Sequence, residues 1–188
     1  MTDPTPALAE NPPSPASGSR RLTIGVAVAA ALAGAGAAWW RLLPGEVDSH
    51  TTSALWAEQF STPTGQALPM ANFQGRPLLL NFWATWCPPC VKELPLLNRF
   101  YQAQRSKGWQ VLGLAIDQQA SVAKFLQHTP LDFPLALGGA SGLQWVRTLG
   151  NQAGGLPFSV LFAADGRILQ RKIGELSSAD LESWSRTL

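Results

Sequence analysis

Residues 78–90 decide the fold of this chain, and they read Leu-Leu-Leu-Asn-Phe-Trp-Ala-Thr-Trp-Cys-Pro-Pro-Cys. The run from Leu78 to Trp83 is apolar apart from Asn81, which is typical of a strand buried on both faces of a sheet. Two prolines follow, and proline is favoured at the first positions of a helix. Apolar residues then recur at helical spacing to about Arg105. The sequence therefore predicts a buried strand, a short loop and a helix, with Cys87 and Cys90 at the junction.

Cys87 and Cys90 are the chain's two cysteines, three positions apart. A disulfide across so short a loop removes little unfolded-state entropy, so redox chemistry or metal binding explains the spacing better than stability does. A structural zinc site needs four ligands, and the chain has only His50 and His128 besides the cysteines. We therefore expect no metal and no cofactor. Unpaired N–H groups at a helix N-terminus stabilise a thiolate, which makes Cys87 the expected nucleophile and Cys90 the resolving thiol.

The rest of the chain from residue 61 alternates between strand and helix patterns. Strands are predicted at 111–116, 133–137, 158–162 and 167–173, and helices at 121–127, 141–149 and 177–184. This order predicts an α/β fold with a central mixed β-sheet flanked by helices, in one domain over residues 61–188. The net charge of +2 gives no reason to expect a nucleic-acid partner.

The N-terminal part has a different composition. Residues 1–19 are rich in proline and small polar residues, and we expect them to be a disordered tail. Residues 20–43 contain an uncharged run that would span about 28 Å as a helix, close to the hydrocarbon thickness of a bilayer. Residues 44–60 are expected to be a linker.

Three interpretations of the apolar run compete: an uncleaved transmembrane anchor, a cleaved secretory signal and a buried core helix. Trp39 and Trp40 before Arg41 favour the anchor, because indole rings prefer the headgroup region. Arg20 and Arg21 on the other side would keep the N-terminus in the cytoplasm. We therefore expect a single-pass protein of a bacterial inner membrane whose domain faces the periplasm, with a cleaved soluble form as the alternative.

Residues 81–90, followed by Lys92-Glu93-Leu94-Pro95, resemble the TlpA/ResA branch of the thioredoxin superfamily. The similarity runs from about Gly65 to the C-terminus. It includes the motif at residues 72–77, a central insert after the second strand, and Gly154-Gly155-Leu156-Pro157. The resemblance implies a thioredoxin-like fold, with an N-terminal extension, and thiol–disulfide oxidoreductase activity.

The resemblance also implies a substrate-binding edge. Pro157 matches the position of a cis-proline beside the cysteines, which would leave the backbone of Leu156 free to pair with an extended peptide. A trans proline that opens a strand is the alternative. Trp86 would form an apolar rim for the substrate, next to Pro88 and Pro89.

Glu93 matches a glutamate that lies near the disulfide in this branch. There it would raise thiol pKa values and relay a proton to or from Cys90. The alternative is an exposed helix glutamate. Asn81 occupies the position of a buried acid in thioredoxin, and its amide cannot transfer that proton.

The function implied is reduction of oxidised cysteines in exported proteins, with electrons supplied by a membrane thiol transporter. Apocytochrome c or a copper-site protein would be the client, and we expect a monomer. Two other hypotheses stay open: a redox-inert docking or metal-delivery module, and a thiol peroxidase.

Overall fold

The computed structural model describes residues 49–187, with side chains from Thr52 onward. The predicted disordered tail at 1–19, the predicted anchor helix at 20–43 and the first residues of the predicted linker lie outside this range. No helix within residues 49–187 combines the length and the apolar character needed to cross a membrane.

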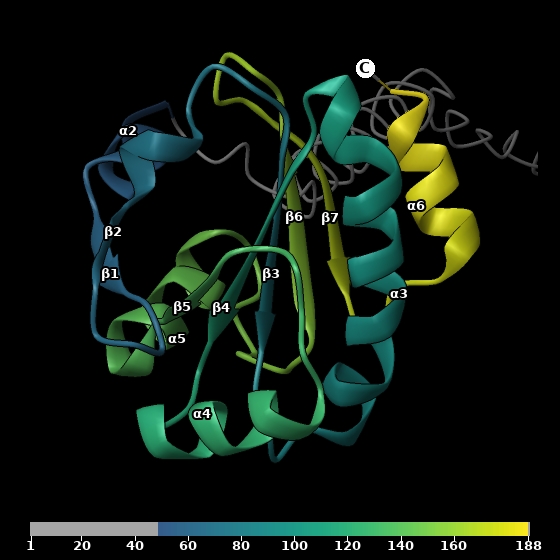
Figure 1. Ribbon diagram of the computed structural model, residues 1–188. Helices are drawn as coiled ribbons and strands as arrows, with labels where there is room; N and C mark the ends of the chain where they lie inside the picture. The colour runs from purple at the N-terminus through teal and green to yellow at the C-terminus, as the bar shows by residue number, and fades with distance from the viewer. Residues whose placement is uncertain (1–48, 188) are drawn as a thin grey trace, which may run out of the picture. The chain divides into compact units, whose positions relative to one another are not determined.

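The centre of the molecule is a seven-stranded mixed sheet with the order β2-β1-β5-β4-β3-β6-β7 (Figure 1). β3 pairs in parallel with β4 and β4 with β5, whereas β3–β6, β6–β7, β1–β5 and β1–β2 are antiparallel. The strands are β1 (Gln59–Ser61), β2 (Ala67–Pro69), β3 (Leu78–Trp83), β4 (Gln110–Ala115), β5 (Leu135–Leu137), β6 (Phe158–Phe162) and β7 (Ile168–Ile173).

The central strand β3 is buried at all six of its residues. Because successive side chains of a strand point to opposite faces, its residues divide between two cores. Leu78, Leu80 and Phe82 belong to one hydrophobic cluster. Leu79 and Trp83 belong to the other, which also contains both cysteines. This double burial explains why β3 reads as a continuous apolar run.

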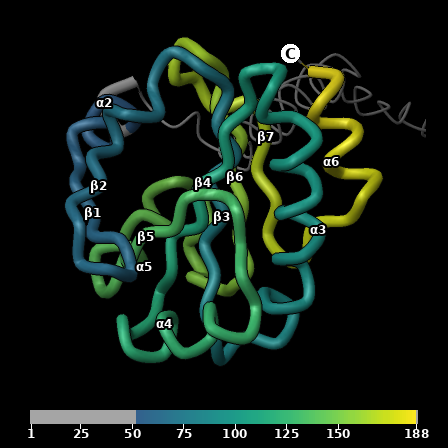
Figure 2. Tube along the Cα trace, viewed as in Figure 1, coloured from purple at the N-terminus to yellow at the C-terminus, as the bar shows by residue number. Residues whose placement is uncertain are grey.

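Helices cover both faces of the sheet, as the tube in Figure 2 also shows. Residues of α3, α4 and α6 contribute to the cluster that holds the cysteines, and residues of α2 and α5 contribute to the opposite one. The helices are α2 (Ser49–Trp56), α3 (Pro88–Gln104), α4 (Gln119–His128), α5 (Gly139–Thr148) and α6 (Ser178–Ser185), with 3-10 turns η1 (Met70–Phe73) and η2 (Arg105–Lys107).

The α/β architecture and the mixed sheet flanked by helices are confirmed. The predicted strand at 78–83 has the bounds of β3, and the other elements between residues 88 and 185 lie within a few residues of their predicted ranges. α4 and β5 form the stretch between β4 and α5 where the insert was expected. α6 begins with a capping box formed by Ser177 and Asp180.

The predicted linker at 44–60 differs from the structure. Residues 49–56 form α2, and β1 begins at Gln59. Leu55, Trp56 and Phe60 are buried, and the Trp56 ring packs edge-on against Phe162 at 5.2 Å between centroids. Two elements this short have too few residues to show a hydrophobic period, so their place in the core depends on tertiary contacts.

Candidate active site

The loop from β3 to α3 places Cys87 as the N-cap residue of the helix. The backbone of Cys87 is extended, and its Sγ accepts a hydrogen bond from the backbone N–H of Cys90 at 3.4 Å. Pro88 and Pro89 occupy the first helical positions, where a missing N–H leaves no intrahelical bond unmade. The backbone N–H of Cys90, the first one after the two prolines, and the positive end of the helix dipole therefore act on the sulfur of Cys87.

Cys87 and Cys90 form a disulfide in this structure, with Cα atoms 5.3 Å apart. Cys87 retains 5% of its accessible surface, whereas Cys90 retains none. The sulfur at the helix cap is thus the outer member of the pair. This arrangement suits attack by Cys87 and resolution by Cys90.

Glu93 lies one helical turn beyond Cys90 and is 1% exposed, so the alternative of an exposed helix glutamate does not hold. Its Oε1 accepts a hydrogen bond from Nδ2 of Asn81 at 2.7 Å, and its Oε2 accepts one from the backbone N–H of Leu176 at 2.7 Å. Burial raises the pKa of Glu93 from 4.5 to about 7, although these two hydrogen bonds act in the opposite direction. Glu93 therefore changes charge near neutral pH.

Charged groups from β7 and the loop after it act on Glu93. The carboxylate of Glu175 raises the pKa of Glu93, and the ammonium group of Lys172 lowers it. Lys92, next to Glu93 on α3, extends to the surface and pairs with Glu175 at 2.9 Å. The carboxyl group of Glu93 consequently lies inside the protein with charges of both signs around it.

The peptide bond between Leu156 and Pro157 is cis, as the resemblance implied. Phe82 of β3 pairs with Phe158 of β6, so Pro157 enters the sheet at the edge where β3 leads to Cys87. Leu156 packs against the cluster that contains both cysteines. Within residues 49–187 its backbone N–H and C=O have no hydrogen-bond partner. The buried Asn151 supports this loop, because its Nδ2 donates to the carbonyl oxygen of Gly155 at 2.7 Å.

Trp86 precedes Cys87 and is 65% exposed, an unusual exposure for an indole ring. It borders a groove of about 530 Å³ between the active-site loop and the start of α5, lined also by Ile116 and Asp117. Pro88 and Pro89 are exposed beside it. Trp83, by contrast, is fully buried, as predicted.

Asp117 and Ser159 are two residues of this site that sequence reasoning missed. Oδ2 of Asp117 accepts hydrogen bonds from both the backbone N–H and Oγ1 of Thr85, at 2.8 and 2.6 Å, and so holds the loop before Cys87. Ser159 Oγ accepts the second hydrogen of the Asn81 amide at 2.9 Å. A signal existed for Asp117, because the carboxyl ends of neighbouring parallel strands meet at one edge of a sheet. Nothing in the sequence indicated Ser159.

The structure thus brings most of the predicted site residues to one end of the sheet: Trp86, Cys87, Pro88, Pro89, Cys90, Leu156 and Pro157. Glu93 lies one helical turn further along α3. Among residues 49–187, no three histidine, cysteine, aspartate or glutamate side chains are grouped so as to hold a metal ion.

Known proteins share this architecture. The profile of the Redoxin family matches residues 55–184. The thiol-disulfide oxidoreductase ResA of Bacillus thuringiensis (strain Al Hakam) is 33% identical over 125 residues, which cover 66% of this chain and 70% of that protein.

Two solved structures agree with these sequence matches. StoA from Bacillus subtilis aligns at 29% identity with a TM-score of 0.55, covering 68% of this chain and 95% of that one. A thioredoxin-related protein from Neisseria meningitidis serogroup B aligns at 29% identity with a TM-score of 0.62, covering 69% and 97%. This chain has the thioredoxin-like fold and is a thiol–disulfide oxidoreductase. It belongs to the Redoxin family, in the ResA/TlpA-like branch of the thioredoxin superfamily.

Proposed function

We propose that this chain reduces disulfides of exported proteins by exchange at Cys87 and Cys90, outside the inner membrane of a bacterium. The observation that carries the proposal is the cysteine pair at the N-terminus of α3, with its outer sulfur at the helix cap. Among residues 49–187, the exposed indole of Trp86 and the unpaired backbone groups of Leu156 lie at the same end of the sheet, where a client peptide would contact them.

The exchange starts from the dithiol. The Cys87 thiolate attacks one sulfur of the client disulfide, forming a mixed disulfide while the other client sulfur leaves and takes a proton. Cys90, deprotonated, then attacks the sulfur of Cys87 and releases the second client thiol. Two electrons pass to the client, and the chain ends with the Cys87–Cys90 disulfide. An external dithiol, which we take to be a membrane thiol transporter, returns it to the dithiol.

We assign Glu93 the transfer of the proton from Cys90. Its carboxyl group is buried one helical turn from Cys90, and its pKa of about 7 makes both protonation states accessible at neutral pH. Asn81 cannot take this role, because an amide does not accept a proton at these pH values. The proton needed for one of the two client thiols thus need not come directly from bulk water.

Client binding is assigned to Trp86, Pro88, Pro89 and the Leu156–Pro157 pair. Within the described part of the chain the backbone groups of Leu156 are unpaired, and an extended client segment would satisfy them by strand-like pairing. The exposed Trp86 ring would cover apolar side chains next to the client cysteine. The contact is mostly with backbone, which suits a range of client sequences.

The apolar segment at residues 22–40 supports a membrane tether, with the domain in the periplasm. Disulfides persist in that compartment, so it contains oxidised clients. Apocytochrome c before haem attachment, or a protein with copper-binding cysteines, has paired thiols that must be reduced before they can react. We propose these as the client classes.

The test is a pair of trapping variants in the full-length chain. Cys90→Ala should capture clients as mixed disulfides on Cys87, because the resolving thiol is missing, and Cys87→Ala should capture none. Capture by Cys87→Ala instead would reverse the two roles. Empty traps in both variants would contradict exchange and favour a redox-inert docking module. Equilibration with glutathione buffers tests direction, since a potential well above about −200 mV would exclude a reductant.

A further inference from the structure

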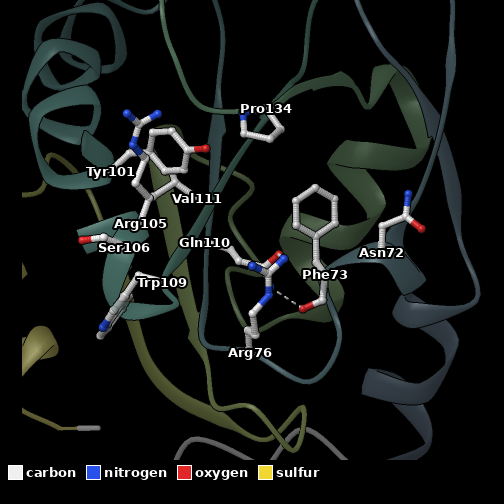
Figure 3. A pocket seen from close by; sticks show the side chains of 10 residues that line it. All are labelled: Asn72, Phe73, Arg76, Tyr101, Arg105, Ser106, Trp109, Gln110, Val111 and Pro134. Atoms are coloured by element: carbon white, nitrogen blue, oxygen red, sulfur yellow. Dashed lines mark hydrogen bonds between the residues drawn. The ribbon is translucent and has the colours of Figure 1, made fainter. Parts of the chain in front are cut away.

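A second pocket lies at the end of the sheet opposite to the disulfide (Figure 3). Its volume is about 440 Å³, within the range of small-molecule sites. It lies where α3 ends and where β3 and β4 begin. The 17 residues of α3 separate it from Cys87 by about 25 Å, at about 1.5 Å per residue. A ligand in this pocket would not be a substrate of the disulfide.

One guanidinium group in the pocket is held in place by a buried amide. Nη2 of Arg76 donates to Oε1 of Gln110 at 2.9 Å, and Nε2 of Gln110 donates to the carbonyl oxygen of Phe73 at 2.7 Å. Gln110 is 7% exposed, so both ends of its amide are committed to this arrangement. Arg76 forms no ion pair with any carboxylate in the described part of the chain. Its other N–H groups remain for a ligand.

A second guanidinium group borders the same space. The Arg105 Cζ lies 6.0 Å from the centre of the Tyr101 ring, and Figure 3 shows both side chains at one side of the pocket. Asp132 is the acid that interacts with Arg105 electrostatically, and its carboxylate is already bonded by Asn98 and Gln102. None of the described residues that line the pocket is a carboxylate, so the charge that they bring to it is positive.

The other walls are aromatic and largely buried. Phe73 and Trp109 are 5% and 6% exposed, and Tyr101 is half-buried. Aromatic walls favour a flat apolar body, and guanidinium forks favour a planar carboxylate. We propose that this pocket binds a small aromatic carboxylate, with its anionic group on Arg76 and Arg105 and its ring against Phe73 and Tyr101.

Calorimetry with the full-length chain and 2-naphthoate tests the proposal. We expect saturable binding at one site, weakened at least tenfold by Arg76→Gln and by Arg105→Gln. Arg99→Gln is the matched control, because Arg99 is exposed on α3 outside the pocket. The uncharged 2-naphthalenemethanol should bind at least tenfold more weakly than 2-naphthoate, and inorganic phosphate should also bind more weakly.

Each other outcome overturns the proposal. Absence of saturation excludes the site, and equal affinity for the alcohol excludes recognition of the carboxylate. Phosphate that binds as tightly as 2-naphthoate excludes an aromatic ligand. If Arg99→Gln weakens the binding of 2-naphthoate as much as the pocket variants do, the binding depends on the net charge of the protein and not on this pocket. NMR locates the ligand: the indole N–H resonance of Trp109 should shift on addition of 2-naphthoate while that of Trp86 stays in place, and the reverse would place the ligand at the redox end.

Discussion

Asn81 donates a hydrogen bond from Nδ2 to Oε1 of Glu93 at 2.7 Å, deep between β3 and α3. The second hydrogen of the same nitrogen goes to Ser159, and Oδ1 of Asn81 is buried with no hydrogen-bond partner among the described residues. This orientation matches a charged Glu93, since a carboxylate only accepts hydrogen bonds. A protonated Glu93 would instead need Oδ1 as an acceptor. The Asn81 amide therefore stabilises the charged form of Glu93 and lowers its pKa, whereas burial raises that pKa.

Removing this donor should raise the pKa of Glu93 above its value of about 7. A hydrogen bond to a charged group contributes about 1.5–3 kcal/mol, so Asn81→Leu should shift the pKa upward by about one to two units. The carboxyl carbon resonance of Glu93 in a pH titration measures this shift. Ser159→Ala is the control, because it leaves the bond between Asn81 and Glu93 in place. An unchanged midpoint in Asn81→Leu would contradict the assignment.

The stability of the oxidised protein should fall as pH rises from about 4.5 to about 7. The folded state keeps a proton on Glu93 that the unfolded chain has lost in this window, so raising the pH favours unfolding. The full effect is about 3 kcal/mol. Glu93→Gln should remove this part of the pH dependence, as measured by denaturant unfolding at pH 4 and pH 8. If the free energy of unfolding of Glu93→Gln depends on pH as steeply as that of the native chain, Glu93 is not the group responsible.

Replacing Glu93 should also change the titration of the reduced cysteines. A carboxylate one helical turn from Cys90 raises thiol pKa values, so Glu93→Gln should lower the pKa of the nearer thiol. The pH dependence of alkylation by iodoacetamide measures it. Glu182→Gln, an exposed substitution on α6, serves as the control. If the pH dependence of alkylation is the same in Glu93→Gln and Glu182→Gln, Glu93 does not influence the thiol of Cys90.

The loop before Cys87 should depend on Asp117. Asp117→Ala removes both hydrogen bonds to Thr85, which should destabilise the fold by about 1–3 kcal/mol and slow exchange at Cys87. Thr85→Val removes only the hydroxyl bond and keeps the backbone one, so its effect on both quantities should be smaller. Denaturant unfolding and the rate of insulin disulfide reduction measure the two effects. Equal losses in the two variants would mean that the backbone bond contributes nothing.

The capping box of α6 should contribute about 1 kcal/mol to stability. Ser177 Oγ accepts from the backbone N–H of Asp180, and the Asp180 carboxylate accepts from Ser177. Ser177→Ala should lower the free energy of unfolding by that amount. Ser178→Ala changes the neighbouring exposed serine, which is outside the capping box, and should be nearly neutral. Denaturant unfolding measures the free energy of unfolding of both variants. A loss in Ser178→Ala as large as that in Ser177→Ala would contradict the contribution of the capping box.

Much of the architecture could be predicted from local patterns. The apolar run of β3 is nearly continuous because both of its faces are buried, and that property is visible in six consecutive residues. The helix after it was predictable from Pro88 and Pro89 and from the spacing of its apolar residues. α2 and β1 were not, because Leu55 and Trp56 occupy a core position that only the assembled sheet creates.

The sequence by itself determined the reacting pair. Cys87 and Cys90 are three residues apart at a helix start, and that spacing and the thiolate stabilisation at a helix start are local properties. Tertiary structure decided everything that requires residues distant in sequence: the burial of Glu93 against Asn81 and Leu176, the bond from Thr85 to Asp117, and the guanidinium group of Arg76 fixed by Gln110. Desolvation and hydrogen bonding depend on which groups meet in space, and a local sequence pattern does not contain that information.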